Sequence, residues 1–292
     1  MVDNYKHLLQ KMDEAGYLTS EEIAVTVFLA LKLNKPLLVE GPPGVGKTEL
    51  AKVLAWVLDT ELIRLQCYEG LDEAKALYEW NYHKQLIAIQ SSKSDKPAFV
   101  FSEEYLLERP LLKALRAPKK PVLLIDEIDK VDEEFEAFLF EILSDFQVSI
   151  PELGTVKARN IPVVVLTSNG SRELSDGLKR RAVYLYLDFP DVKLETKIIL
   201  KKVSGIHENL AKRIAFAVNF LRRELDLFKP PAISETLDWA RTLAALREDR
   251  LTKEFIENTI GFVLKNKEDI EAFREKGGAN RLLQYLNEGA GC

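Results

Sequence analysis

The stretch that decides the fold reads Gly41-Pro42-Pro43-Gly44-Val45-Gly46-Lys47-Thr48. It matches the spacing G-x-x-x-x-G-K-[ST], in which glycines let the backbone curl and point successive N–H groups at phosphate oxygens. The apolar run Pro36 to Val39 precedes it and the amphipathic run Glu49 to Asp59 follows it, which is the strand–loop–helix order that the motif requires. We therefore expect a phosphate-binding loop; a glycine turn that only joins strand to helix is the alternative.

The last two residues of the stretch carry its chemistry. The Lys47 ammonium is long enough to reach the β- and γ-phosphates of a nucleotide, and the Thr48 hydroxyl is a ligand for Mg²⁺. The helix that follows adds the positive end of its dipole. The sequence thus predicts ATP and Mg²⁺ as ligands, with nucleotide contacts from Gly41, Pro42, Pro43, Gly44, Val45, Gly46, Lys47, Thr48 and Glu49.

A second apolar strand, Val122 to Ile125, ends in the two carboxylates of Asp126 and Glu127. In the same sheet as the loop, Asp126 would hold the Mg²⁺ together with Thr48 and so contribute to cofactor binding. Glu127 would face the γ-phosphate as a general base or a water-positioning residue. Acids that merely cap a strand where it enters solvent are the alternative. The third acid, Asp129, fits a helix cap or a supporting residue better than a metal ligand.

A third apolar strand, Val163 to Thr167, is followed by Ser168 and Asn169. Ligands bind outside the carboxyl ends of parallel strands, so Asn169 is placed to hydrogen-bond the attacking water or the γ-phosphate. An asparagine that only forms a turn before Gly170 is the simpler alternative. Asn169 therefore joins Glu127 in the predicted catalytic set.

The chain changes character at Phe189-Pro190-Asp191. Before this point short apolar runs, which also include Leu62 to Leu65 and Val183 to Leu187, alternate with amphipathic segments. This order predicts an α/β domain with a mostly parallel, doubly wound sheet at residues 1–190. The remainder, residues 191–292, is expected to be a separate all-α domain, with helices at Val192 to Val203, Asn209 to Leu227, Ser234 to Leu246 and Thr252 to Lys265.

Composition and charge fit an ordinary globular protein. Hydrophobic residues make up 47% of the 292 residues, and the net charge of −5 gives no general attraction to nucleic acid or to an anionic membrane. The two cysteines, Cys67 and Cys292, form no CxxC pair, which argues against a zinc site or a disulfide framework. No apolar run approaches the ~20 residues of a membrane span, and the N-terminus has no secretory signal pattern. We therefore expect a cytoplasmic protein.

The order of phosphate loop, Asp-Glu strand, polar strand end and helical region resembles an AAA+ ATPase. Within that superfamily the chain is most similar to the MoxR group, and there to the CoxD-like branch, which is associated with maturation of molybdenum-containing carbon monoxide dehydrogenases. The resemblance implies a P-loop core, with a parallel sheet and helices on both faces, followed by a small α-helical lid. The finer likeness rests on Gly70 to Ala74, Tyr78 to Tyr82, Arg109 to Leu112, Glu173 to Arg181 and Ser234 to Ala240.

The resemblance also implies an assembly. AAA+ proteins usually work as hexameric rings, in which each subunit donates an arginine to the γ-phosphate on its neighbour. Arg181, with Arg180 beside it, occupies the place of that arginine at the end of the helix before the last strand. A guanidinium in trans stabilises transition-state charge. A basic, solvated helix end that complements the helix dipole is the alternative, and which of the two arginines would act stays open.

Client and partner follow from the same resemblance. It implies a chaperone that uses ATP hydrolysis to remodel or mature a metalloenzyme, such as a molybdenum enzyme, or another protein client, with a partner that carries a von Willebrand A domain. Two inserts are expected to project toward the ring pore or the client: a hairpin inserted in the second helix at about residues 66–102, and a second hairpin at about residues 146–160. The aromatic Trp80 and Tyr82 of the first insert could equally pack in the core.

One feature departs from the family pattern. Many relatives carry an arginine at the start of the third lid helix, whereas Ile233 to Thr236 has none, and Arg241 fits an exposed helix residue. A nucleic-acid motor or loader is the other reading of function. It would need basic pore loops, and the second insert offers only Lys157 and Arg159, together with the acidic Asp145 and Glu152. A nucleotide-binding switch that does not hydrolyse ATP is disfavoured by the predicted catalytic residues.

Overall fold

The computed structural model describes residues 2–91, 100–246 and 250–289. They fall into two compact units, which are described separately. The core unit comprises Met1–Ala15, Ser20–Gly41 and Lys47–Tyr186, and the helical unit comprises Gly16–Thr19, Pro42–Gly46 and Leu187–Cys292.

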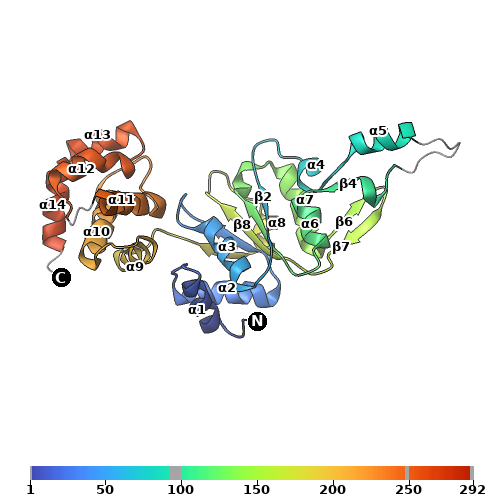
Figure 1. Ribbon diagram of the computed structural model, residues 1–292, viewed down its shortest axis with the longest axis horizontal. Coiled ribbons are helices and arrows are strands. Elements are labelled where there is room, and N and C mark those ends of the chain that lie inside the picture. Colours follow the sequence, from blue (N-terminus) through green and yellow to red (C-terminus); the bar gives the residue numbers. More distant parts are fainter. Residues whose placement is uncertain (1, 92–99, 247–249, 290–292) are drawn as a thin grey trace. The chain divides into compact units, whose positions relative to one another are not determined.

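Five parallel strands form the sheet of the core unit, in the order β2-β5-β8-β1-β9. Figure 1 labels β2 and β8 of this sheet. The predicted parallel sheet is confirmed. β5 and β8 are buried along their whole length, as expected of central strands covered on both faces. In the strand register Gln66 lies opposite Asp126 and Val39 opposite Thr167, so the carboxyl ends of four strands meet at one edge. The strands are β1 (Leu37–Glu40), β2 (Leu62–Gln66), β5 (Val122–Asp126), β8 (Val163–Ser168) and β9 (Val183–Tyr186).

Helices cover both faces of this sheet. Leu123 and Ile125 of β5 share one hydrophobic core with residues of α6 and α7. Leu124 points the other way, because neighbouring residues of a strand face opposite sides, and α3 packs against β2, β5 and β8 outside that core. The main helices of the core unit are α1 (Tyr5–Glu14), α2 (Glu21–Leu33), α3 (Lys47–Val57), α6 (Pro110–Arg116), α7 (Glu133–Asp145) and α8 (Asp176–Arg181).

Side-chain caps fix where several of these helices begin. Ser20, Asp132 and Ser175 each accept a hydrogen bond from the backbone N–H three residues further on, which satisfies a donor that the first helical turn leaves open. The cap at Ser175 begins α8, the helix that carries Arg180 and Arg181.

The first insert differs from the predicted hairpin at residues 66–102. β3 (Tyr78–Trp80) pairs antiparallel with β4 (Leu106–Glu108), and α5 (Tyr82–Ser91) and the short α4 (Glu73–Ala76) and η1 (Glu103–Tyr105) complete the segment. The strand pair therefore closes only at Glu108, beyond the expected end, and the apolar run from Leu86 to Ile89 is helical. Residues 92–99 of the insert lie outside the described residues.

Packing at the base of the insert explains the difference. Trp80 is buried and meets the rings of Tyr78 and Phe101 edge-on, with centroids 6.0 and 5.4 Å apart. The short strands close around this aromatic cluster, so the apolar run beyond them has no partner strand within the described residues. Of the two aromatics weighed from sequence, Trp80 packs in the core, whereas Tyr82 is exposed. A second antiparallel pair, β6 (Gln147–Ile150) and β7 (Gly154–Lys157), lies within residues 146–160.

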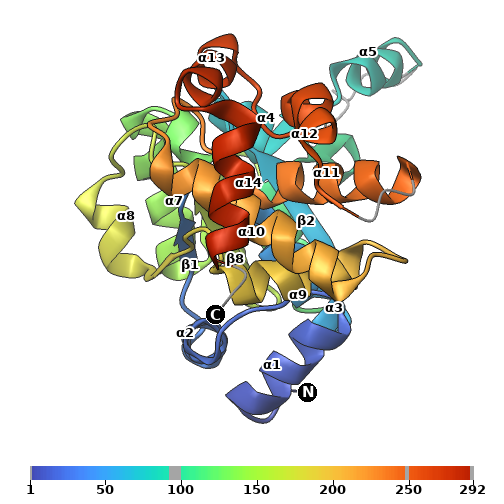
Figure 2. The ribbon, with the colours of Figure 1, turned by 90° about the vertical axis from the view of Figure 1, so that its left-hand side faces the viewer.

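Figure 1 and Figure 2 show the helices of the helical unit. They pack around a hydrophobic core of their own, in which Trp239 is fully buried. The predicted helix from Thr252 to Lys265 is wrong in length, since α12 ends at Thr259 and a 3₁₀ turn, η3 (Ile260–Phe262), follows it. The helices are α9 (Val192–Lys202), α10 (Glu208–Glu224), α11 (Ile233–Leu246), α12 (Lys253–Thr259), α13 (Lys267–Glu275) and α14 (Gly278–Gly289). Among the described residues of the chain no helix is long and apolar enough to cross a membrane.

A buried ion pair ties three helices of this unit together. Arg222 of α10 donates through both terminal nitrogens to the Glu195 carboxylate of α9, at 2.7 and 2.9 Å. The Thr236 hydroxyl of α11 donates to the same carboxylate at 2.7 Å. Burial raises the pKa of Glu195, and Arg222 opposes that rise. A carboxylate so far from water needs these partners to stay charged.

Candidate active site

The loop between β1 and α3 has the backbone that its glycines predict. Gly44 and Gly46 adopt φ values of 76° and 98°, in the left-handed region that favours glycine. Lys47 is buried, and its ammonium donates to the Gly41 carbonyl at 2.6 Å. Burial lowers the pKa of Lys47, and the surrounding carboxylates, Asp129 foremost, oppose that effect. The Lys47 ammonium thus lies at the loop, beside several carboxylates.

Thr48 meets Asp126 at the edge of the sheet. The Thr48 hydroxyl donates to Asp126 Oδ1 at 3.0 Å, and the Thr167 hydroxyl of β8 donates to the same oxygen at 2.5 Å. Asp126 has 2% of its surface exposed, so these donors stabilise a carboxylate that water barely reaches. The structure thus brings the predicted metal ligand of the loop into contact with the predicted metal ligand of β5.

The second carboxylate oxygen of Asp126 forms an ion pair with Arg64 of β2. Arg64 donates to Asp126 Oδ2 at 2.5 Å through the terminal nitrogen that also bonds the Gln66 side-chain oxygen. Arg64 and Gln66 lie two positions apart on β2 and so share one face of the sheet. Strand pairing sets Gln66 beside Asp126, which is why both polar side chains of β2 reach the site.

Glu127 leaves the strand in a left-handed conformation, with φ 59°. Its backbone N–H donates to the Thr167 hydroxyl at 2.9 Å, which holds the turn against β8. Its carboxylate accepts from Gln66 Nε2 at 3.0 Å and from Lys130 Nζ at 2.5 Å. These two donors fix the position of the Glu127 carboxylate at the edge of the sheet.

Asp129 links the Asp-Glu turn to the segment after β8. Its Oδ2 accepts from the backbone N–H of Asn169 at 3.2 Å, and from the N–H and hydroxyl of Ser171 at 3.0 and 2.6 Å. Burial works against the charge, but these hydrogen bonds hold the pKa of Asp129 below its usual value. Its Oδ1 is buried and has no hydrogen-bond partner among the described residues. Asp129 therefore positions Asn169, in keeping with the supporting role expected of it.

The two arginines of α8 differ in their surroundings. The Arg181 guanidinium lies 4.8 Å from the centre of the Phe140 ring, a cation–π distance that steadies the side chain. Arg180 is 83% exposed and faces Asp176 at 3.9 Å. Within the described residues neither arginine contacts Asp126 or Glu127, so the structure does not bring them to these two carboxylates.

Comparison with known proteins identifies the fold family. Residues 36–182, half of the chain, match the family described as AAA domain (dynein-related subfamily). The chain belongs to the AAA+ ATPases. It is 30% identical over 263 residues to the chaperone protein ClpB of Bacillus cereus, covering 87% of this chain but 26% of that one. An uncharacterised protein of Staphylococcus aureus is 28% identical over 222 residues, 73% of this chain and 77% of its own length.

Solved structures agree on the fold. A RuvB variant from Thermotoga maritima superposes with a TM-score of 0.50 at 22% identity, covering 85% of this chain and 70% of that one. At this identity the likeness establishes the AAA+ architecture alone. The chain spans about a quarter of the ClpB protein, since 26% of that protein is matched.

The AAA+ site fits a Mg²⁺ ion that arrives with phosphates. No group of three or more His, Cys, Asp or Glu in the described part of the chain could hold a metal by itself. A hydroxyl and a carboxylate in contact, Thr48 and Asp126, supply two oxygen donors of the kind that Mg²⁺ prefers, and substrate phosphates usually complete its shell. The residues present are therefore consistent with a Mg²⁺·nucleotide site.

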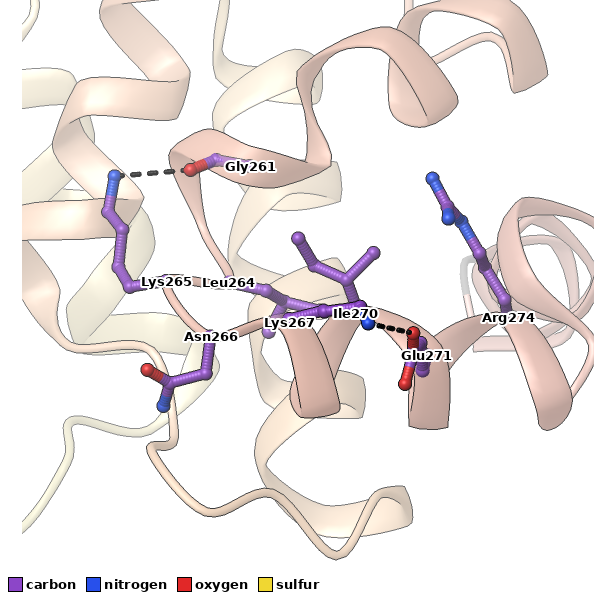
Figure 3. Close-up of a pocket in the computed structure, with 8 residues that line it drawn as sticks. All are labelled: Gly261, Leu264, Lys265, Asn266, Lys267, Ile270, Glu271 and Arg274. Atoms are coloured by element: carbon purple, nitrogen blue, oxygen red, sulfur yellow. Dashed lines mark hydrogen bonds and ion pairs between the residues drawn. The ribbon is translucent and has the colours of Figure 1, made fainter.

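The helical unit of this AAA+ chain carries a separate pocket of about 450 Å³, drawn in Figure 3. None of the predicted site residues lines it; its walls are Gly261, Leu264, Lys265, Asn266, Lys267, Ile270, Glu271 and Arg274. Elsewhere in the unit, Arg241 pairs with Asp238 of its own helix at 2.9 Å and is exposed, as expected from the sequence.

Four side chains at the site were missed from the sequence: Arg64, Gln66, Thr167 and Lys130. Arg64 and Gln66 alternate with apolar residues in a strand, which is the pattern of one polar face. Thr167 sits at the end of an apolar run, where the register with Asp126 makes it a donor. For Arg64, Gln66 and Thr167 only the neighbouring strand reveals the role, because each partner lies 40 to 62 residues away along the chain. Lys130 bonds Glu127 from three residues away.

Proposed function

We propose that this AAA+ chain binds Mg²⁺·ATP at the carboxyl edge of the core sheet and hydrolyses it. The observation that carries the proposal is the hydrogen bond of 3.0 Å between Thr48 and Asp126, residues 78 positions apart. It joins the two predicted metal ligands, one from the phosphate loop and one from β5. A nucleotide site also gives a reason for burying a lysine, Lys47, beside several carboxylates, an arrangement costly without a function.

Each predicted residue has a role in this proposal. The loop from Gly41 to Glu49 binds the phosphates, and Lys47 supplies the protein's own positive charge there. Thr48 and Asp126 hold Mg²⁺, which when bound neutralises phosphate charge. Glu127 accepts a proton from the attacking water or orients it, and Asn169, held by Asp129, orients the same water or the γ-phosphate. Residues 191–292 form the lid of the AAA+ core.

Catalysis is proposed to need a second copy of the chain. Arg181, or Arg180 beside it, reaches the γ-phosphate bound to the neighbouring subunit of a hexameric ring. Two facts support this: both side chains lie at the exposed end of α8, and neither contacts the carboxylates of its own site within the described residues. A guanidinium supplied in trans stabilises the charge that develops in the transition state and makes hydrolysis depend on assembly.

The energy of hydrolysis is proposed to remodel a protein client. The relative named as the chaperone protein ClpB supports a chaperone class. The insert supplies a surface for client contact, since α5 exposes Tyr82, Leu86, Ile87 and Ile89, each more than half accessible; large exposed apolar groups gathered on one element mark interaction sites. The resemblance to the CoxD-like branch of the MoxR group points to a metalloenzyme client, such as a molybdenum enzyme, and to a partner with a von Willebrand A domain.

The test of the nucleotide site uses the Lys47→Ala variant. The purified wild-type chain should bind a fluorescent ATP analogue in the presence of Mg²⁺, and Lys47→Ala should lose that binding while keeping the wild-type circular dichroism spectrum. A folded Lys47→Ala variant with unaltered affinity would overturn the assignment. The client proposal has its own test, a pull-down with Glu127→Gln in ATP, which should retain partner and client together.

A further inference from the structure

Arg64 gives Asp126 a positive partner within the protein itself. Asp126 Oδ1 accepts from Thr48 and Thr167, and Oδ2 accepts from Arg64 at 2.5 Å. The Asp126 side chain is 3% exposed, whereas the Arg64 side chain is 50% exposed. The pair therefore joins a fixed, buried anion to a long, partly solvated cation.

The same carboxylate is the proposed ligand of Mg²⁺. A buried carboxylate is stable only with a compensating charge or a full set of donors. Without nucleotide, Arg64 supplies that charge; with Mg²⁺ held by Thr48 and Asp126, the ion supplies it. Two cations beside one carboxylate repel each other, so binding of Mg²⁺ disfavours the contact between Arg64 and Asp126.

Gln66 is a second hydrogen-bond acceptor for the Arg64 guanidinium, and it stays available if Arg64 leaves Asp126. Its side-chain oxygen already accepts from the nitrogen of Arg64 that bonds Asp126. Release from Asp126 therefore leaves Arg64 with one protein partner and with water, at little cost to a side chain already half in solvent. Nothing else in the strand needs to move.

We propose that Arg64 is a built-in counter-ion that occupies Asp126 in the nucleotide-free chain and is displaced by Mg²⁺. The inference rests on the proposed Mg²⁺·nucleotide site and adds a residue that sets how much Mg²⁺ the site requires. Arg64 is thus a positioning residue: it holds Asp126 ready while the cation is absent and weakens Mg²⁺ binding by competition.

The test measures ADP binding by calorimetry at increasing Mg²⁺ concentrations. It compares the Arg64→Met and Arg64→Lys variants with the wild type. Arg64→Met removes the competing charge at similar length, so the Mg²⁺ concentration at half-saturation should fall about fivefold, the effect of a partly screened ion pair of about 1 kcal/mol. Arg64→Lys keeps a charge and should stay near the wild-type value. Arg109→Met is a matched control, because Arg109 pairs with Glu79 at 2.5 Å in the insert and is 44% exposed.

Thermal unfolding distinguishes displacement from a general effect of charge. Arg64→Met should melt below the wild type without ligand, and the gap should close at saturating Mg²⁺·ADP, because the ion then replaces the lost partner. A gap of equal size in both states, or a Mg²⁺ midpoint that is unchanged or higher, would overturn the proposal. A wild type that binds no Mg²⁺·ADP would refute the proposed function as well. Arg64→Gln serves the same comparison if Arg64→Met does not fold.

Discussion

Thr167 is the residue through which β8 holds the Asp126 carboxylate and the backbone of Glu127, and its replacement by valine isolates that contribution. Its hydroxyl donates to Asp126 Oδ1 at 2.5 Å and accepts the backbone N–H of Glu127 at 2.9 Å. Thr167 has 1% of its surface exposed, so water cannot replace either bond. Valine has nearly the same shape, and the change therefore removes two hydrogen bonds without opening a cavity.

The magnitude follows from the two partners. The bond to the Asp126 carboxylate is charge-assisted and contributes roughly 1.5–3 kcal/mol, and leaving the Glu127 N–H without an acceptor costs roughly 1–3 kcal/mol. Thr167→Val should accordingly lower the free energy of unfolding by about 3 kcal/mol. Thr167→Ser keeps the hydroxyl and removes one methyl group, which should cost about 1 kcal/mol.

Urea unfolding of the two variants, with the wild type alongside, measures the difference. The same preparations should be assayed for ATP turnover, because a released Glu127 backbone no longer fixes its carboxylate. We expect Thr167→Val to be both less stable and slower than Thr167→Ser. Equal losses in the two variants would refute the reasoning, since the methyl group and not the hydroxyl would then explain the effect.

Two further predictions concern α8 and Cys67, the residue after β2. One of Arg181→Ala and Arg180→Ala should lower ATP turnover by about 10³-fold with unchanged nucleotide affinity, and the comparison identifies the trans arginine; wild-type turnover that persists at dilutions where the chain is monomeric would contradict a trans arginine. Burial raises the pKa of the Cys67 thiol to about 12, so in a Cys292→Ser background iodoacetamide at pH 8 should modify the native chain on the order of a thousandfold more slowly than the unfolded chain. Because the folded pKa lies above the ordinary value of 9.0, the free energy of unfolding should fall as pH rises from 9 toward 12. Rapid native alkylation would refute the burial argument.

The strands of the sheet and the linear motifs could be predicted from the sequence because each consists of consecutive residues. The strands are short apolar runs bounded by polar residues, and the loop from Gly41 to Thr48 has fixed spacing within one segment. Asp126 and Glu127 follow one such run directly. Their placement beside the loop needed only the rule that parallel strands share a carboxyl edge.

Features that depend on contacts between distant parts of the chain could not be predicted from the sequence. The role of Arg64 exists only because strand register sets β2 beside β5. The run from Leu86 to Ile89 is too short to separate helix from strand by periodicity, and only the structure shows that it belongs to α5. The helix after Thr252 ends early at Thr259, whose hydroxyl bonds the Phe255 carbonyl at 2.6 Å and accepts the Trp239 indole N–H at 2.8 Å. A tertiary hydrogen bond thus accompanies the break in a pattern that looked continuous.

The most direct test of the account is phosphate release by Glu127→Gln, with nucleotide binding measured on the same sample. The amide keeps the size of the side chain but cannot accept a proton, so the variant should bind Mg²⁺·ATP as tightly as the wild type. Its rate of phosphate release should fall by about 10²- to 10⁴-fold. Release at a rate near that of the wild type would contradict the central claim that Glu127, at the edge that holds Thr48 and Asp126, activates the attacking water.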